Sequence, residues 1–130
     1  MGAKYLIDTN AVIKYLTVIF PSKGIEFMDS IVDEESVISF ITEIELQVWN
    51  PIDPSDLDVY LEFISSSRRI LPDDPIIQET IKIRKAHNLK IPDALIAATA
   101  IVHDLILLSD NDKDFKKVNG LKYINPMTLH

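Results

Sequence analysis

Short apolar runs separated by stretches of helical periodicity are the main pattern along the chain. Residues 4–8, 37–41 and 105–109 are runs of strand length, rich in aliphatic and β-branched side chains, and residues 121–124 form a fourth. Residues 69–71 make a shorter run that ends at a proline. The pattern therefore predicts four strands and one brief extended segment.

The stretches between these runs carry apolar residues three and four positions apart, which is the spacing of the buried face of a helix. Pro21 stops one helix, Ser22 and Ser55 can cap the next ones, and Pro92 opens another. The helix after Pro92 is almost wholly apolar, so we expect it to be the most buried. Helices are predicted over residues 10–19, 22–33, 55–64, 75–83 and 93–103, with short ones near residues 43–49 and 115–118.

Strands that alternate with helices indicate one α/β domain over residues 1–130. The crossover between two parallel strands is right-handed, and its helix packs on a face of the sheet. We therefore expect a mostly parallel sheet covered by helices on both faces. In such a sheet, ligands bind beyond the carboxyl ends of the strands.

Composition narrows where the protein can act. The chain has no cysteine, which excludes disulfides, thiolate metal sites and a cysteine nucleophile, and which is typical of a reducing compartment. The first residues run directly into a predicted strand, and the longest uncharged apolar run, residues 94–102, is far shorter than a membrane span. We expect a cytoplasmic protein with no membrane partner.

The net charge of −7 argues against a protein that coats nucleic acid, because such proteins are normally basic. The charge is uneven: residues 1–67 hold 3 Lys and Arg against 12 Asp and Glu, whereas residues 68–130 hold 10 against 8. The basic residues of the second half form either a solvated helix face or a patch that positions phosphate groups. The densest basic stretch comprises Arg68, Arg69, Lys82, Arg84, Lys85 and Lys90.

Acidic residues occur where predicted strands end or helices begin. Asp8 and Asp110 end strands, Glu45 lies in a helix that follows a strand, and Asp93 lies in the first turn of a helix. Because equivalent ends of parallel strands meet at one edge of a sheet, these carboxylates can converge. A converged acidic cluster repels itself unless a cation neutralises it, and oxygen ligands suit Mg²⁺ or Mn²⁺.

Each acid also has a local explanation. Asp8 and Asp93 can act as a helix cap or a first-turn charge, and aspartate is common in turns such as the one after residue 109. Thr42 and Glu45 have the spacing of a capping box, in which the glutamate reaches back to the cap backbone. The apolar surroundings of Asp8 and Asp93 favour a shared cation, because an unpaired buried carboxylate is costly.

Four blocks of sequence surround the acidic residues. They are residues 6–10 (LIDTN), 38–46 (ISFITEIEL), 91–100 (IPDALIAATA) and 107–115 (LLSDNDKDF). In their order and content these blocks resemble the motifs of PIN-domain ribonucleases, and the third block is the most specific. They span nearly the whole chain, which is most similar to the VapC-type toxins of prokaryotic toxin–antitoxin pairs.

The resemblance implies a three-layer α/β/α domain whose acids bind Mg²⁺ or Mn²⁺ and hydrolyse RNA phosphodiesters. It assigns Asp8, Glu45 and Asp93 to the acidic site. The polar residues beside these acids in the motifs are expected to support the site. They are Thr9, Asn10, Ser109 and Asn111.

The chain departs from the family pattern in two places. The fourth block usually has threonine, any residue and then an acid, but here Asn111 stands in the acid's position and Asp110 and Asp112 flank it. Either of these two can supply the fourth carboxylate. The family often has a glycine four residues after the second-block glutamate, where this chain has Trp49.

The leading interpretation is a metal-dependent endoribonuclease. Asp8 and Asp93 would bind the cation directly, and Glu45 with Asp110 or Asp112 would complete the shell or hold a second ion. Such a site needs neither histidine nor cysteine, because oxygen ligands suit hard cations.

The expected partners are an RNA substrate, a small antitoxin that covers the acidic cleft, and a second copy of the chain. Apolar residues near Ile19 and Phe20 would suit the homodimer if they are exposed. Two other classes stay open: a PIN-like fold that has lost catalysis and acts as a binding module, and a receiver-like signalling domain that binds Mg²⁺. The receiver-like domain also gathers acidic residues at the ends of parallel strands.

Overall fold

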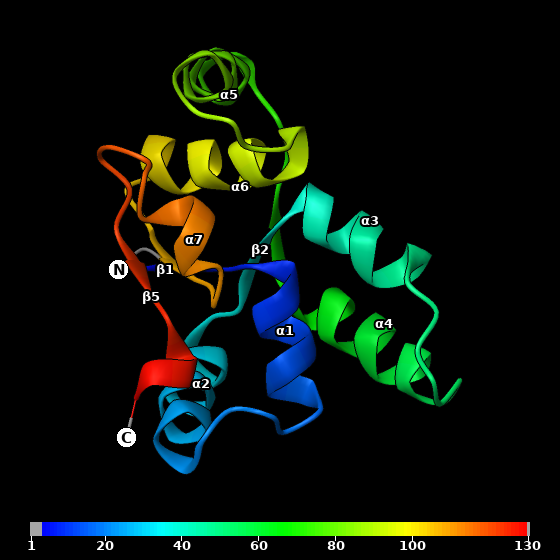
Figure 1. Ribbon diagram of the computed structural model, residues 1–130. Coiled ribbons are helices and arrows are strands. Elements are labelled where there is room, and N and C mark those ends of the chain that lie inside the picture. The colour runs from blue at the N-terminus through cyan, green and yellow to red at the C-terminus, as the bar shows by residue number, and fades with distance from the viewer. Residues whose placement is uncertain (1–3, 130) are drawn as a thin grey trace.

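The computed structural model describes residues 4–129, in which short strands alternate with helices (Figure 1). The predicted order of elements is present, and the brief extended segment near residues 69–71 is a strand. The elements are β1 (Tyr5–Ile7), α1 (Thr9–Leu16), α2 (Ser22–Glu34), β2 (Val37–Ser39), α3 (Phe40–Val48), α4 (Asp56–Ser66), β3 (Arg68–Ile70), α5 (Asp74–Ala86), α6 (Ile91–Val102), β4 (Ile106–Leu108), α7 (Asp112–Phe115), β5 (Tyr123–Ile124) and the 3-10 helix η1 (Pro126–Thr128).

The strands form two parallel ladders that lie side by side. β1, β4 and β5 are hydrogen-bonded in that order, and β2 pairs with β3. Because β1 also contacts β2, the spatial order is β3–β2–β1–β4–β5, with β1 at the centre. The predicted parallel sheet is confirmed.

Alternate residues of the strands face two separate apolar cores. In β1, Leu6 packs with residues of α5 and α6, whereas Ile7 packs with residues of α1, α2 and α4. Leu107 and Leu108 of β4 divide between the two cores in the same way. This period of two is the geometry of a strand, and it places helices on both faces of the sheet (Figure 1). The three-layer α/β/α fold is therefore confirmed.

α6 has more buried residues than any other helix within residues 4–129, as its composition predicts. The alanines of this helix pack in the core that contains Leu6 and Leu107, and Asp93 lies in its first turn. In the part of the chain that the structure describes, no helix combines the length and the apolar surface needed to cross a bilayer. The buried residues of α6 are Ala94, Ile96, Ala97, Ala98, Thr99 and Ala100.

The end of the second strand differs from its prediction. The strand stops at Ser39, and Phe40 and Ile41 already belong to α3, because the Ser39 hydroxyl accepts a hydrogen bond from the backbone N–H of Ile41 at 3.2 Å and caps the helix. The apolar run continues through this turn, so periodicity alone could not locate it. The predicted capping box of Thr42 and Glu45 is wrong, because both residues lie inside the helix.

Phe20 is buried rather than exposed. Its side chain is 4% exposed and packs in the core that contains α1 and α2, whereas Ile19 is 55% exposed. A homodimer surface that includes Phe20 is therefore wrong.

Candidate functional site

Asp8 lies at the carboxyl end of the central strand β1 and is only 5% exposed. It caps α1, since Oδ1 accepts a hydrogen bond from the backbone N–H of Thr9 at 2.9 Å. Its other oxygen, Oδ2, accepts one from the hydroxyl of Ser109, beyond the end of β4, at 2.8 Å. Ser109 is fully buried and accepts from the backbone N–H of Asn111 at 3.1 Å. Hydrogen bonds from the start of α1 and from the residue after β4 thus fix the orientation of this carboxyl group.

The electrostatic environment of Asp8 disfavours its charge. Burial raises the pKa of Asp8 to about 6, the hydrogen bonds from Ser109 and Thr9 oppose this shift, and the charges of Asp93 and Glu45 add to it. Asp93 and Glu45 are therefore near enough to act on Asp8, although they lie far from it in sequence. A nearby cation would reverse the shift.

A chain of hydroxyl groups holds Glu45. The Thr9 hydroxyl donates to Oε1 of Glu45 at 2.7 Å and lies 2.9 Å from the hydroxyl oxygen of Thr42. A hydroxyl has one proton, so Thr42 must donate to Thr9 if Thr9 donates to Glu45. Thr42 is fully buried, which keeps water from competing for these bonds. The first turn of α1 therefore positions the glutamate of α3.

Asp93 lies in the first turn of α6 and is half-buried. Burial raises the pKa of Asp93, the charges of Asp114 and Glu45 raise it further, and Lys90 lowers it. Glu45 and Asp114 are therefore both near enough for their charges to act on Asp93.

Asp110 and Asp112 each have a partner away from these acids. Asp110 forms an ion pair with Lys14 of α1. Asp112 accepts a hydrogen bond from the side-chain amide of Asn125 at 3.2 Å. Asp112 also accepts a hydrogen bond from Tyr123. Burial is the main cause that raises the pKa of Tyr123, and this hydrogen bond raises it further. Both carboxylates therefore tie the loop after β4 to neighbouring segments.

Asp114 is the acid of this loop whose charge acts on Asp93. Asn111 orients it: the Asn111 amide donates to Oδ2 of Asp114 at 3.1 Å, and its carbonyl oxygen accepts from the Asp114 backbone N–H at 3.3 Å. Lys117 lies 3.7 Å from its other oxygen. Asn111 is thus the N-cap of α7, and its side chain fixes the orientation of the Asp114 carboxylate.

A groove of about 850 Å³ opens between α1 and α3 beside Glu45. Thr9, Asn10 and Glu45 form its polar wall, and the rest is largely apolar. The apolar residues of the groove are Ile13, Ile44, Val48 and Trp49, of which the last three are exposed.

The donor set around Asp8 is made of carboxylate and hydroxyl oxygens, which suit a hard divalent cation. Among residues 4–129, no three acidic or histidine side chains are gathered closely enough to form a protein cage for a metal ion. Mg²⁺ does not need such a cage, because it usually binds one or two carboxylates and keeps several waters. Burial and the nearby charges of Asp93 and Glu45 raise the pKa of Asp8, and a cation bound beside it would relieve both effects.

Two residues of the site, Asp114 and Thr42, lie within the motif blocks, but neither of them is among the site residues predicted from the sequence. Asp114 lies three residues after Asn111, which is the spacing of an N-cap and its third helical residue, so a helix-cap reading of the fourth block could have found it. Thr42 lies one helical turn before Glu45 and therefore on the same face of α3. No sequence pattern predicts the hydrogen bond between the Thr42 and Thr9 hydroxyl groups, because the two residues are 33 positions apart.

A family model described as PIN domain matches residues 5–121. The search of curated protein sequences found no match. Similar solved structures were found for nearly the full length of the chain.

Three of these structures illustrate the similarity. A toxin–antitoxin complex from Klebsiella pneumoniae contains a chain that is 26% identical, with a TM-score of 0.74 over 95% of this chain and 98% of that one. FitAcB from Neisseria gonorrhoeae has 26% identity and a TM-score of 0.73, over 96% and 99% of the two chains. DNA-bound VapBC from Salmonella typhimurium has 24% identity and a TM-score of 0.81, again over 96% and 99%, and supports the fold alone.

Proposed function

This chain belongs to the PIN domain family, and from that premise we propose that it is a metal-dependent endoribonuclease, the toxin of a toxin–antitoxin pair, acting on RNA in the cytoplasm. The observation that carries the proposal is the buried Asp8 at the carboxyl end of β1, with Glu45 hydrogen-bonded to the adjacent Thr9 and Asp93 near enough for its charge to act on Asp8. A chain in the toxin–antitoxin complex from Klebsiella pneumoniae, similar over its full length, supports the toxin assignment.

Asp8 and Asp93 would hold Mg²⁺ or Mn²⁺, with Glu45 and Asp114 completing the acidic site. The bound ion would lower the pKa of a coordinated water and neutralise charge on the phosphate. In hydrolysis the oxygen of water forms a bond to phosphorus, the bond from phosphorus to the leaving ribose oxygen breaks, and that oxygen takes up a proton. The hydrogen bonds from Thr9 and Ser109 favour the ionised form of Asp8, which is the form that binds a cation.

The direct test is cleavage of a mixed cellular RNA by the purified chain. We expect cleavage in Mn²⁺ or Mg²⁺ and none after the metal is removed with EDTA. The temperature of unfolding should rise when Mn²⁺ is added, because the ion binds only the folded chain. A chain that cleaves no RNA and whose melting is unchanged by Mn²⁺ would instead be a PIN-like binding module.

We propose Asp114 as the fourth acid of the site, in place of Asp110 or Asp112. Asp114→Asn is expected to lower the cleavage rate about tenfold or more, because it removes a charge that acts on Asp93. Asp110→Asn is the matched control, since its loss breaks the pair with Lys14 and leaves the field at Asp93 in place. The measurement is the initial cleavage rate of each variant, and a loss confined to Asp114→Asn supports the assignment. A larger loss in Asp110→Asn or Asp112→Asn would return the fourth position to one of those residues.

Thr9 is expected to act as a positioning residue. Thr9→Val removes the hydroxyl that donates to Glu45 and should lower the cleavage rate about 10- to 100-fold, as for other groups that orient a metal-site carboxylate. Thr9→Ser keeps the hydroxyl and should retain most of the activity. Rates measured across a range of Mn²⁺ concentrations should show a weaker apparent metal affinity in Thr9→Val alone. Equal rates in the two variants would remove this role from Thr9.

The groove between α1 and α3 is proposed as the antitoxin surface. Its apolar residues Ile44 and Val48 are exposed and lie beside Glu45, so a partner helix with an apolar face could cover them and direct an arginine at the acids. A small protein encoded beside this gene should then inhibit cleavage when the two are co-expressed. Val48→Glu should weaken that inhibition, whereas Val102→Glu, at the exposed end of α6 far from Asp93, should not.

A further inference from the structure

Trp49 is an exposed aromatic residue one helical turn after Glu45. It is the C-cap of α3, and its backbone N–H donates to the Glu45 carbonyl at 3.1 Å. The indole ring lies against the ring of Tyr60 on α4, with the two ring centroids 5.8 Å apart and the planes inclined by 32°. Tyr60 is 1% exposed, whereas Trp49 is 42% exposed. A buried partner therefore holds the indole in place while part of it faces solvent.

The groove between α1 and α3 places this ring beside two side-chain amides. Asn10 of α1 and Asn50, the residue after Trp49, both line the groove and both are exposed. A side-chain amide can donate and accept hydrogen bonds at once. Among the described residues that line the groove, Glu45 alone is charged. The lining thus suits a flat, neutral molecule with donors and acceptors at its edge, and it offers no cation to a phosphate group.

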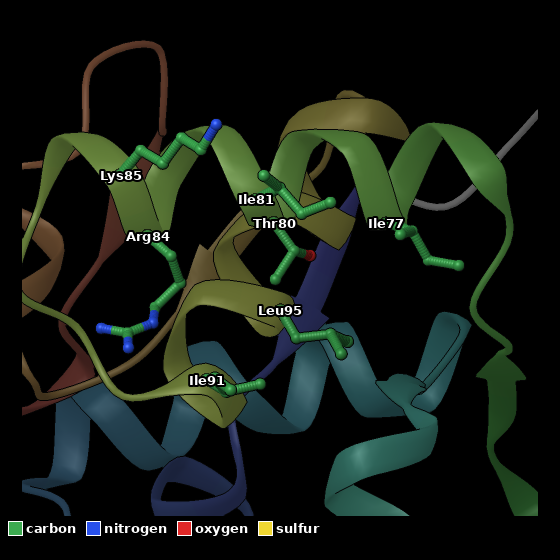
Figure 2. A pocket seen from close by; sticks show the side chains of 7 residues that line it. All are labelled: Ile77, Thr80, Ile81, Arg84, Lys85, Ile91 and Leu95. Carbon is green, nitrogen blue, oxygen red and sulfur yellow. The ribbon is translucent and has the colours of Figure 1, made fainter.

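The second groove, between α5 and α6, has a different lining (Figure 2). Its volume is about 490 Å³, and its wall combines aliphatic side chains with Thr80 and the cations Arg84 and Lys85. Within the described part of the chain, no aromatic ring or amide lines it. An aromatic ligand with a polar edge therefore fits the groove beside Glu45 better.

We propose that Trp49 stacks on an unpaired nucleobase of the RNA substrate and that the amides of Asn10 and Asn50 bind the edge of this base. This inference rests on the proposed nuclease function, because the acidic site that includes Glu45 brings the RNA strand to the groove. Bases that are free of a duplex can stack on aromatic side chains and expose their edges to hydrogen bonds. The subsite therefore selects single-stranded RNA, and an antitoxin bound over the same groove would exclude the base.

Fluorescence of the indole tests the stacking directly. The chain has one tryptophan, so its emission reports on this groove alone. The Asp8→Asn chain, which is expected to leave RNA intact, is titrated in Mn²⁺ with a short random-sequence single-stranded RNA. The emission should be quenched, because a stacked base quenches an indole. An abasic oligomer of the same length, which has the phosphates without the bases, should leave the emission nearly unchanged, and so should duplex RNA.

Substitution of Trp49 tests the contribution of the ring to affinity. In the same Asp8→Asn chain, Trp49→Ala should raise the Kd for end-labelled single-stranded RNA about 10- to 100-fold, as expected for the loss of one stacked base. Trp49→Phe keeps an aromatic ring and should restore most of the affinity. Ile52→Ala, at a fully exposed residue outside the groove, is the control and should bind RNA like its parent. Fluorescence anisotropy of the labelled RNA measures all of these proteins.

Cleavage kinetics separate a binding role of Trp49 from a structural one. With Asp8 in place, Trp49→Ala should raise KM with little change in kcat, because the base is bound alike before and during the reaction. Asn50→Ala keeps the stack and should bring the Kd values of oligoadenylate, oligocytidylate and oligouridylate closer together. Homopolymers that bind the parent chain equally well would remove the base-reading role from the amides.

Two results would overturn the subsite while cleavage by the unmodified chain left the nuclease function standing. The first is an emission that RNA does not quench, or that the abasic oligomer quenches equally. The second is unchanged RNA affinity in Trp49→Ala together with weaker inhibition by the antitoxin, which would assign the ring to the antitoxin surface alone. Quenching by single-stranded RNA in a chain that cleaves nothing in Mn²⁺ would instead support the subsite and overturn the nuclease function.

Discussion

Replacing Asp8 with asparagine is expected to lower RNA cleavage by roughly a thousandfold or more while the fold persists. The carboxylate is the proposed direct ligand of the cation, and a neutral amide binds hard cations far more weakly. The fold should persist because asparagine has nearly the same shape and its oxygen can still accept the Thr9 bond that caps α1. Asp93→Asn should cause a loss of similar size.

Single-turnover cleavage in saturating Mn²⁺ measures the effect, with circular dichroism to verify the fold. Asp58→Asn, at an exposed position of α4, is a matched control and should cleave like the unmodified chain. Full activity in Asp8→Asn would remove the proposed metal site from the end of β1. Activity lost together with the fold would assign Asp8 a structural role as the cap of α1.

The metal-free chain is expected to lose stability as the pH rises from about 4 to about 6. Burial raises the pKa of Asp8 from 3.8 to about 6, so in this window the folded chain holds a proton that the unfolded chain has released. Folding is therefore favoured at the lower pH, and the contribution is gone above the folded pKa. The shift corresponds to about 3 kcal/mol in the free energy of unfolding. Asp93 changes stability in the same direction, because its pKa is also raised.

Urea unfolding in EDTA at several pH values between 4 and 7 measures this dependence. Asp8→Asn does not titrate, so it should be more stable than the unmodified chain at pH 7 and should lose the part of the pH dependence that Asp8 contributes. Asp104→Asn, at an exposed carboxylate paired with Lys122, should keep the full dependence. A difference between Asp8→Asn and the unmodified chain that is constant over this pH range would contradict the raised pKa.

These two predictions describe one property of the site. The buried carboxylate that the proposed chemistry needs destabilises the metal-free fold at neutral pH. Addition of Mn²⁺ should therefore stabilise the unmodified chain more than Asp8→Asn, because the ion binds and neutralises the ionised form.

Local sequence determined much of this protein. The apolar runs define the strands, since alternate residues such as Leu6 and Ile7 must face opposite cores, and parallel pairing follows from the helices between them. It also placed Asp8, Glu45 and Asp93 at related ends of elements, because position along a strand or helix decides where a side chain emerges. In the structure these three carboxylates are near enough for their charges to raise the pKa values of Asp8 and Asp93 in addition to burial.

Tertiary structure decided what depends on partners distant in the chain. Asp110, Asp112 and Asp114 alternate in one short segment, so the family pattern alone did not separate them, and only the cap spacing from Asn111 distinguishes Asp114. In the folded chain Lys14 forms an ion pair with Asp110, and Asn125 donates a hydrogen bond to Asp112. The charge of Asp114 acts on Asp93. In the same way, the Glu45 side chain is held by a hydrogen bond from Thr9 of α1. The capping box with Thr42, which local sequence suggested, is not formed. The energy of a polar side chain depends on the donors and charges that folding brings to it, and those come from the whole chain.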